Sequence, residues 1–265
     1  MTLTLSVIIP AYEKLNDVLL CLNSLQRYAS RQVLIEFIVC DDCSPSVNMQ
    51  LLVPPLIAKV IRNASNMGFA GNNNTRAAIA PGDILFFVNQ DVFGAETDND
   101  GLPFSQNWDI ALVNAFENPE VGIVGAKLLF PDGKVQNAGG FFDARSQPFH
   151  RGLGYANHRY HEVNTAGEVS WTTGAALAIR RGLFQQVGGF DTCYVGGYFE
   201  DVALCLKARE AGYKVWYEPT CQLVHSVGST GGSPHFMQNA KRFYDTWVAT
   251  SKVEPDVAAV KERFW

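Results

Sequence analysis

Two amide side chains and a carboxylate, those of Asn89, Gln90 and Asp91, stand directly after five consecutive apolar residues, Ile84–Val88. Such a run predicts a strand that is buried on both faces, as in parallel sheets covered by helices. Ligands of open α/β sheets bind beyond the carboxyl ends of the strands, and an aspartate there can bind a divalent cation. Taken alone, Asp91 is better explained as the cap of the next segment, and the rest of the chain reverses this preference.

Two earlier apolar runs, at residues 5–10 and 33–40, also end at groups that could contact a ligand. The first ends at Pro10-Ala11-Tyr12, an aromatic or backbone wall, and the second at Asp41-Asp42, which could accept hydrogen bonds from a base. Because parallel strands place their carboxyl ends on one edge of a sheet, we expect the three ends to form a crevice for a nucleotide. The absence of a Gly-x-Gly-x-x-Gly or Walker A loop disfavours dinucleotide and phosphate-loop enzymes.

Two further acids, Glu200 and Asp201, begin a segment that we expect to form a helix ending at Gly212. Glycine just after the last helical residue is a common end signal. Acids in the first turn complement the helix dipole, so a structural role explains these two residues equally well. His225 precedes a Gly/Ser-rich loop, and a lone histidine of this kind is usually structural.

The first 92 residues are predicted to form a Rossmann-like half of an α/β protein. The expected order is strand, helix, strand, strand, helix, strand, with right-handed crossovers. The predicted strands are residues 5–10, 33–40, 59–62 and 84–88, and the predicted helices are residues 15–25 and 75–80.

The pattern is less regular after residue 93. Residues 131–169 lack clear periodicity and are predicted to be a long functional loop region, and its three histidines, His150, His158 and His161, are expected to make surface or substrate contacts rather than a metal cluster. The other predicted elements are helices at 109–116, 200–211, 236–248 and 257–264, strands at 121–130 and 213–217, and a strand-like run at 171–179.

The composition is that of an ordinary globular protein, with 265 residues, 47% of them hydrophobic, and a net charge of -5. This charge offers no basic surface for nucleic acid, so a phosphate group in a ligand would need a metal or local donors. The six cysteines form no disulfide framework, and reduced thiols are expected. No run reaches the roughly 20 apolar residues of a membrane span, and the N-terminus lacks the basic start of a signal peptide, so we expect a cytoplasmic protein.

Five groups of motifs follow one another along the chain. They are Ser6-Val-Ile-Ile-Pro-Ala-Tyr12, Val39-Cys-Asp-Asp-Cys-Ser44, Asn66-Met-Gly-Phe-Ala-Gly-Asn72, Val88-Asn-Gln-Asp-Val92, and the set Thr173-Gly-Ala175, Gly189-Phe-Asp191, Phe199-Glu-Asp201 and Gly212-Tyr-Lys-Val215. In this order they resemble the motifs of the inverting, nucleotide-sugar-dependent glycosyltransferases of family 2, which have the GT-A fold, and the Asn-x-Asp form is the one common among rhamnosyltransferase-like members. The resemblance covers most of the chain, about residues 3–250.

The resemblance implies one GT-A domain with a mostly parallel central sheet. It divides into a nucleotide-sugar-binding half at about 1–92, an acceptor-binding half at about 93–234 and C-terminal helices at 235–265. The resemblance also assigns roles to the matching residues, with Asp41 or Asp42 accepting the N3–H of uracil or thymine. The implied residues are Pro10, Ala11, Tyr12, Asp41, Asp42, Asn66, Gly68, Asn72 and Asn89 for the nucleotide, Thr173, Gly174 and Glu200 for the sugars, Asp91 and His225 for the metal, and Asp201 as the general base.

The implied chemistry suits these residue types. Displacement at an anomeric carbon expels a nucleoside diphosphate, and Mg²⁺ or Mn²⁺ held by a carboxylate can offset its charge. A carboxylate on the opposite face deprotonates the acceptor hydroxyl, and a single displacement inverts the centre. We therefore expect a UDP- or dTDP-sugar donor and a glycan or lipid-linked acceptor of cell-surface polysaccharide synthesis. A lipid-linked acceptor would be met by peripheral association with the inner face of the membrane.

Two residues depart from the family's pattern. Asn89 stands where many relatives have an aspartate, which leaves one clear carboxylate for the metal, and Ala203 stands where many repeat an acid, which would alter acceptor contacts. These departures keep open an inactive nucleotide- or glycan-binding module of the same fold, although the intact Asp201 argues against it. Nucleotidyl transfer would require a glycine-rich, basic loop after the first strand, and Ala11-Tyr12-Glu13 is not such a loop.

Overall fold

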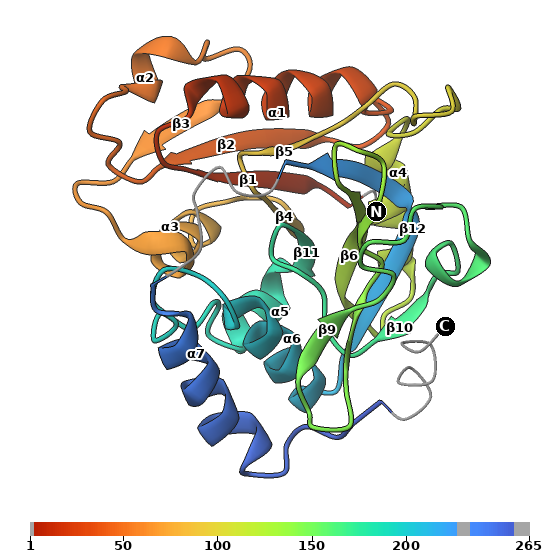
Figure 1. The fold of residues 1–265 in the computed structure, drawn as a ribbon. Helices are drawn as coiled ribbons and strands as arrows, with labels where there is room; N and C mark the ends of the chain where they lie inside the picture. The colour runs from red at the N-terminus through yellow and green to blue at the C-terminus, as the bar shows by residue number, and fades with distance from the viewer. Residues whose placement is uncertain (1–2, 227–233, 257–265) are drawn as a thin grey trace.

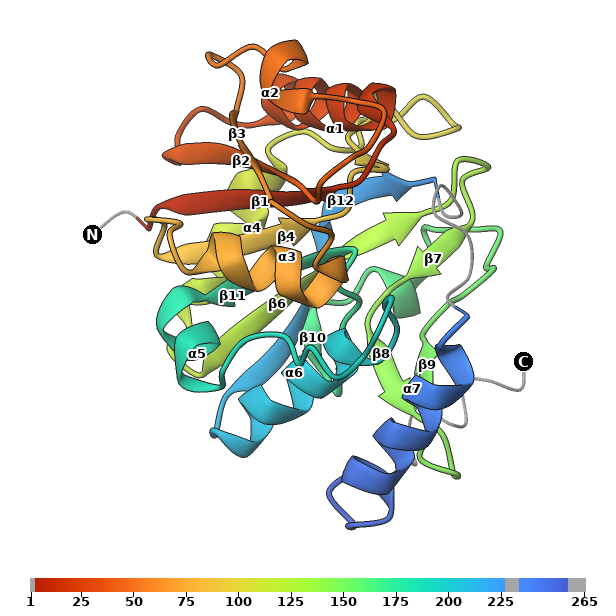
Figure 2. The ribbon, with the colours of Figure 1, turned by 90° about the vertical axis from the view of Figure 1, so that its left-hand side faces the viewer.

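One mixed sheet runs through the molecule, and helices cover both of its faces (Figures 1 and 2). The computed structural model describes residues 3–226 and 234–256. From one edge to the other, the strands are β10 (Gly167–Val169), β12 (Lys214–His225), β6 (Val121–Leu129), β11 (Ala176–Arg180), β4 (Ile84–Val88), β1 (Leu5–Ala11), β2 (Ile35–Asp41) and β3 (Lys59–Arg62). Two short strands extend it, β5 (Val92–Phe93) beside β12 and β7 (Val135–Asn137) beside β6, and a separate hairpin pairs β8 (Gly140–Phe142) with β9 (Pro148–His150).

Among the described residues, helices occur at or near the positions expected at 15–25, 75–80, 109–116, 200–211 and 236–248, together with several short ones that were not expected. They are α1 (Leu15–Tyr28), α2 (Met49–Leu52), α3 (Gly68–Ala77), α4 (Trp108–Asn114), α5 (Arg181–Gln186), α6 (Glu200–Glu210) and α7 (Phe236–Phe243), with 3-10 turns η1 (Ala115–Glu117) and η2 (His161–Val163) and a π-helical turn η3 (Tyr244–Val248). In Figure 1, α1 lies above the sheet, whereas α3, α5 and α6 lie below it.

The parallel strands β3, β2, β1 and β4 confirm the predicted Rossmann-like arrangement. The register of β1 and β2 places Ala11 opposite Asp41, so the ends of these two strands lie side by side. The side chains of β4 alternate between two cores, as the pleat requires. Leu85 and Phe87 belong to the core on the side of α3, α5 and α6, while Ile84, Phe86 and Val88 belong to the core on the side of α1 and α4.

The second half of the sheet brings distant segments to the same edge. β11 is antiparallel to β4, with Ala176 opposite Val88, and the Asn89 amide donates to the Ala175 carbonyl. β12 is parallel to β6 and antiparallel to β5, with His225 opposite Val92. These two registers place the segments before β11 and after β12 next to the end of β4.

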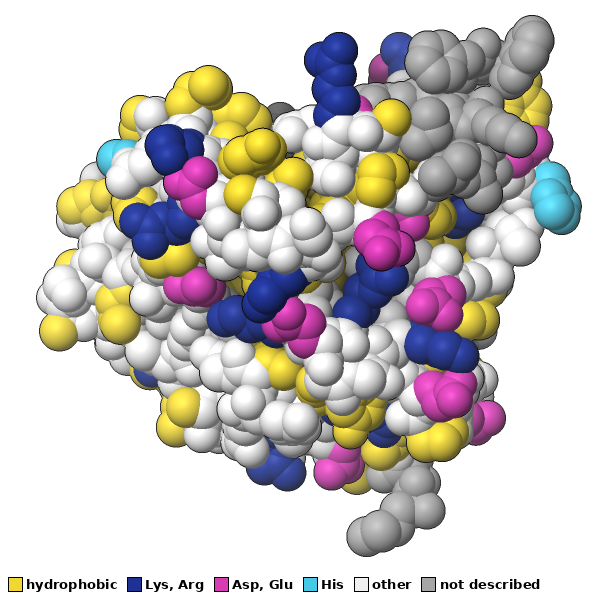
Figure 3. Space-filling view, turned by 90° about the horizontal axis from the view of Figure 1, so that it is seen from below, with side chains coloured by type: hydrophobic (Ala, Val, Ile, Leu, Met, Phe, Trp, Pro, Cys, Tyr) yellow, Lys and Arg dark blue, Asp and Glu magenta, His cyan; other side chains and the backbone are white. Residues whose placement is uncertain are grey.

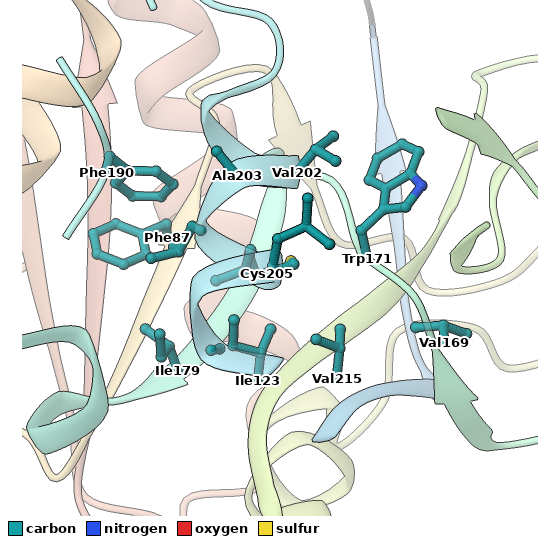
Figure 4. Packing of buried hydrophobic residues seen from close by; sticks show 14 of the residues in the cluster. Phe87, Ile123, Val169, Trp171, Ile179, Phe190, Val202, Ala203, Cys205 and Val215 are labelled. Carbon is teal, nitrogen blue, oxygen red and sulfur yellow. The ribbon is translucent and has the colours of Figure 1, made fainter. Parts of the chain in front are cut away.

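Helix α6 packs closely on the sheet between two aromatic groups (Figure 4). In this view Val202, Ala203 and Cys205 lie between Phe87 on one side and Trp171 on the other. Ala203 is buried in this core and does not line the cavity described below. The structure therefore gives no support to the expected effect of Ala203 on acceptor contacts.

The start of α3 differs from the prediction of a helix at 75–80. The helix begins at Gly68, seven residues earlier, because the Asp42 carboxylate accepts hydrogen bonds from the backbone amides of Met67 at 2.8 Å and Gly68 at 2.9 Å. Amides at a helix start need acceptors, and a carboxylate there also complements the helix dipole. The residue that supplies it is 25 positions away in the chain from Met67, so local propensity could not indicate it.

Residues 131–169 are more ordered than the predicted loop region, since they contain β7, β8, β9, η2 and β10. Lys127 is fully buried under this region and donates hydrogen bonds to the His158 carbonyl at 2.6 Å and to Asn164 Oδ1 at 2.7 Å. Burial lowers the pKa of Lys127 to about 8. The prediction of a surface or substrate contact was wrong for His158, which is buried beside Asp98.

Several other boundaries differ. The strand-like run at 171–179 begins as a strand only at Ala176, and the strand predicted at 213–217 continues to His225 through a bulge. The predicted helix at 257–264 lies outside the described residues.

Within the described part of the chain, no helix has the length and apolar character needed to cross a membrane. On the face in Figure 3, basic and acidic side chains lie intermixed.

Candidate functional site

A cavity of about 870 Å³ opens at the carboxyl ends of β1, β2 and β4. Its volume lies in the range of small-molecule binding sites. The predicted site residues that line it are Pro10, Ala11, Tyr12, Asp42, Asn66, Gly68, Asn72, Asn89, Asp91, Thr173, Gly174, Glu200, Asp201 and His225. The structure thus brings together residues from both halves of the chain, because β11 and β12 return to the edge at which β4 ends.

Asp41 is the predicted site residue that does not line the cavity. Its side chain is fully buried, with Oδ2 2.5 Å from Arg62 Nη1 and Oδ1 accepting the Ser44 amide at 2.9 Å. Of the two adjacent aspartates, the structure therefore places Asp42 at the cavity and gives Asp41 an internal ion pair. The sequence could not separate them, because the Asp41 carboxylate is directed by Arg62 and the Asp42 carboxylate by groups of the segment at 63–68.

Asp42 belongs to a buried polar network beneath the end of the cavity that β1 and β2 form. Asn63 donates from Nδ2 both to Asp42 Oδ1 at 2.8 Å and to Asn72 Oδ1 at 2.9 Å. Asn72 in turn donates to the Cys40 carbonyl at 2.8 Å, and Arg76 donates to Asn63 Oδ1. These bonds fix the two cavity residues, Asp42 and Asn72, in one orientation.

The wall residue Tyr12 is held by Gln90, which the sequence placed at the end of β4 without a role. The Tyr12 amide donates to Gln90 Oε1 at 3.0 Å, and Gln90 Nε2 donates to the Tyr12 carbonyl at 3.3 Å. The Tyr12 side chain remains half-exposed at the cavity. A flat aromatic ring in this position can stack on a base.

Asp91 and His225 form the candidate metal site. Asp91 Oδ1 lies 3.1 Å from His225 Nε2, and the Ser226 amide donates to the Asp91 carbonyl at 3.0 Å. Two ligands at right angles, each about 2.1 Å from a Mg²⁺ ion, stand about 3.0 Å apart. The carboxylate oxygen of Asp91 suits Mg²⁺ or Mn²⁺, whereas an imidazole nitrogen is a more usual ligand of transition-metal ions. Within the described residues, no third Asp, Glu, His or Cys completes a protein-only site, so oxygens of the ligand would supply further donors.

Glu200 and Asp201 begin α6, and both residues line the cavity. Asp201 Oδ2 accepts the Gly174 amide at 2.8 Å, and Oδ1 accepts the Val202 amide at 2.8 Å. Burial raises the pKa of Asp201 in spite of these bonds. Burial, followed by the charge of Asp201, raises the pKa of Glu200 well above its ordinary value. A carboxylate with a raised pKa is a stronger base, as proton abstraction requires.

The turn before these acids has an unusual backbone. All four residues at 196–199 have positive φ angles, and the two that are not glycine both have a φ of 74°. Non-glycine residues rarely adopt this conformation, which surrounding contacts must hold in place. Asn239 of α7 is fully buried and supplies such contacts, since its Nδ2 donates to the carbonyls of Val195 at 2.9 Å and Gly197 at 2.7 Å. The C-terminal helix therefore supports the turn from which Glu200 and Asp201 start.

Several cavity residues carried no assigned role in the sequence. Gln136, Trp171, Tyr198 and Phe236 also line the cavity, and His150 does so as the predicted substrate contact would require. Three of these four residues are aromatic, a type common in small-molecule sites. Their common location was not predictable, because Gln136 and the three aromatic residues come from four separate segments that meet only in the folded chain.

Residues 6–188 match the family model described as Glycosyl transferase family 2. The chain is 31% identical over 188 residues to the uncharacterized protein y4gI of Sinorhizobium fredii, a match covering 70% of this chain and 20% of that protein. It is also 31% identical over 156 residues to N-acetylglucosaminyl-diphospho-decaprenol L-rhamnosyltransferase of Mycobacterium tuberculosis, covering 51% of this chain and 48% of the relative. The chain thus spans between a fifth and about half of the length of these relatives.

The fold also resembles that of solved glycosyltransferases. The structure of GalNAc-T7 with UDP, GalNAc and Mn²⁺ superposes with a TM-score of 0.75 over 95% of this chain and 50% of that chain, at 18% identity. At this identity the similarity concerns the fold, which is the GT-A fold predicted from the motifs.

Proposed function

The chain belongs to glycosyl transferase family 2, and from this premise we propose that it moves a sugar from a UDP- or dTDP-sugar to a hydroxyl of a glycan or lipid-linked saccharide, with inversion. The observation that carries the proposal is the position of two different reactive groups in one cavity. An oxygen and nitrogen pair, Asp91 and His225, and a pair of buried acids, Glu200 and Asp201, both line it. Donor activation and acceptor deprotonation require these two kinds of group.

The nucleotide is proposed to bind at the ends of β1 and β2. Tyr12 would stack on the base and Asp42 would accept from its N3–H, while Asn66, Gly68, Asn72 and Asn89 would lie beside the nucleotide. The half at about 1–92 would hold the donor, and the half at about 93–234 would hold the acceptor. The C-terminal segment at 235–265 includes α7, which supports the turn before α6.

Asp91 and His225 would hold Mg²⁺ or Mn²⁺. When bound, the cation offsets the negative charge of the departing diphosphate. Asp201 would take the proton of the attacking hydroxyl, and the amides of Gly174 and Val202 would keep its oxygens in place as it does so. Thr173, Gly174 and Glu200 would position the sugars around the reacting carbon.

The acceptor is proposed to be a saccharide that the aromatic residues of the cavity contact. Tyr198 and Phe236 are both half-exposed, line the cavity, and pack edge to face with ring centroids 5.2 Å apart. Apolar rings suit both sugar faces and a lipid chain. The name of the Mycobacterium tuberculosis relative specifies a decaprenol-linked acceptor, which supports a lipid-linked acceptor here. Such an acceptor would be met at the inner face of the membrane, within cell-surface polysaccharide synthesis.

The test begins with calorimetric binding of UDP, dTDP and GDP, each with and without Mn²⁺. Metal-dependent binding of UDP or dTDP is expected. Asp201→Asn should retain this binding but lose transfer by roughly 100- to 10,000-fold. Asp245→Asn, on the exposed face beyond α7, is the control and should change neither.

Two outcomes would contradict the proposal in different ways. Transfer that persists in Asp201→Asn would exclude this residue as the base. Binding without turnover of any donor would favour an inactive nucleotide- or glycan-binding module of the same fold.

A further inference from the structure

Gln136 lies behind the candidate metal site. It belongs to β7, lines the cavity, and is buried beside the end of β12. Its Oε1 lies 2.6 Å from His225 Nδ1, and its Nε2 donates to the backbone carbonyl of the same histidine at 3.3 Å. One amide therefore bonds both the ring and the backbone of His225.

These two bonds determine the chemical form of the neutral imidazole. A carbonyl oxygen only accepts hydrogen bonds, so the amide nitrogen of Gln136 must face it and the amide oxygen must face Nδ1. An amide oxygen also only accepts, so Nδ1 must carry a proton. In the neutral ring Nε2 then has a lone pair, and that lone pair is what a metal ion binds.

The lone pair on His225 Nε2 lies next to the carboxylate of Asp91. Nε2 lies 3.1 Å from Asp91 Oδ1, which is also an acceptor. Two acceptors at this separation repel each other unless a cation or a proton lies between them. Gln136 therefore keeps His225 in the form in which the pair attracts a cation.

We propose that Gln136 is a positioning residue that holds His225 as the Nδ1–H tautomer and so prepares Nε2 to bind the divalent cation of the nucleotide-sugar complex. The proposal rests on the proposed function, because the cation is the one that the donor brings. Partners that fix the tautomer of a ligand histidine change metal affinity by roughly 10- to 100-fold.

The next residue of β7 supplies an internal comparison. Asn137 Oδ1 lies 3.0 Å from His150 Nδ1, and Asn137 Nδ2 donates to the Ala126 carbonyl at 3.1 Å. The same reasoning makes Nδ1 of His150 the protonated nitrogen. His150 should therefore show the same tautomer as His225, but it should not depend on Gln136.

The first experiment is nuclear magnetic resonance of protein with ¹⁵N-labelled histidine, at about pH 8 where an ordinary imidazole is neutral. The metal-free protein should show the Nδ1–H tautomer for both His225 and His150. Gln136→Leu should reduce the Nδ1–H fraction of His225 and leave His150 unchanged. Gln136→Glu, whose carboxylate also accepts from Nδ1–H, should restore it. Gln136→Met provides a second apolar variant of similar length if the leucine variant does not fold.

The second experiment measures Mn²⁺-dependent UDP binding by calorimetry. Gln136→Leu should weaken it roughly 10- to 100-fold, and Gln136→Glu should recover most of the loss. Gln185→Leu, a change at an exposed glutamine of α5 that does not line the cavity, should have little effect.

The two experiments separate the proposal from the function on which it rests. An Nε2–H tautomer for His225 in the unaltered protein, or wild-type Mn²⁺-dependent binding in both apolar variants, would overturn the role of Gln136. Failure of the unaltered protein to bind Mn²⁺ with UDP, dTDP or GDP would instead count against the proposed function, while the tautomer of His225 would still report on Gln136.

Discussion

Replacing Glu200 with glutamine tests the electrostatics of the buried acid pair. Glu200 is 6% exposed, and its Oε2 has no hydrogen-bond partner among the described residues. Burial first, and the charge of Asp201 second, raise its pKa well above the ordinary 4.5. Because the protonated acid and the glutamine amide have nearly the same shape and no charge, Glu200→Gln should preserve the fold and most of the activity.

The sign of the stability effect follows from proton linkage. In the unfolded chain Glu200 loses its proton near its ordinary pKa of 4.5, whereas in the folded protein it keeps the proton to a higher pH. Between these values the folded state binds more protons, so the free energy of unfolding falls as the pH rises, by up to about 1.4 kcal/mol per pH unit. Glu200→Gln removes this contribution. The variant should be more stable than the unaltered protein at neutral pH and should show a smaller slope.

Asp201 should account for the pH dependence of the free energy of unfolding that remains in Glu200→Gln. It should also differ from Glu200 in its effect on activity. Its pKa is also raised above 3.8 by burial, so its contribution to stability has the same sign and persists in Glu200→Gln. Transfer should increase with pH as Asp201 loses its proton, in both the unaltered protein and Glu200→Gln. The two acids thus have similar linkage to folding but different effects on turnover.

Chemical denaturation at several pH values between about 4 and 8, with donor turnover measured in parallel, provides the assay. Glu210→Gln, at the exposed end of the same helix, is the control and should leave the slope unchanged. A wild-type slope in Glu200→Gln would show that Glu200 is ionised in the folded protein. If Glu200→Gln abolished turnover and Asp201→Asn did not, the assigned base would be the wrong acid.

Two other substitutions test the remaining parts of the site. Asp91→Ala should remove the Mn²⁺-dependent part of nucleotide binding in calorimetry, and an unchanged metal dependence would place the cation elsewhere. Asn239→Ala should leave buried carbonyls of the turn before α6 without a donor, at about 1–3 kcal/mol each, and should speed hydrogen exchange at residues 195–199. Because Asp201 would lose its fixed position, turnover should fall about 100-fold, and unchanged exchange and turnover would refute a role for α7.

The order of strands and helices in the first half was predictable because its signals are local. Apolar runs mark β1, β2 and β4, and helical spacing marks α1. The family motifs extended the prediction to the whole fold, and every site residue that they implied except Asp41 lines the cavity. The start of α3 was the main error, since the acceptor that caps it is Asp42 on a different element.

The sequence by itself determined which residue types the site contains and at which strand and helix ends they stand, because periodicity and motif spacing are properties of the chain. The tertiary structure decided which atoms face one another. It directed Asp42 to the cavity and Asp41 to Arg62, and it brought Gln136 to His225. These contacts join residues 21 and 89 positions apart, and only the packing of separate strands sets such distances.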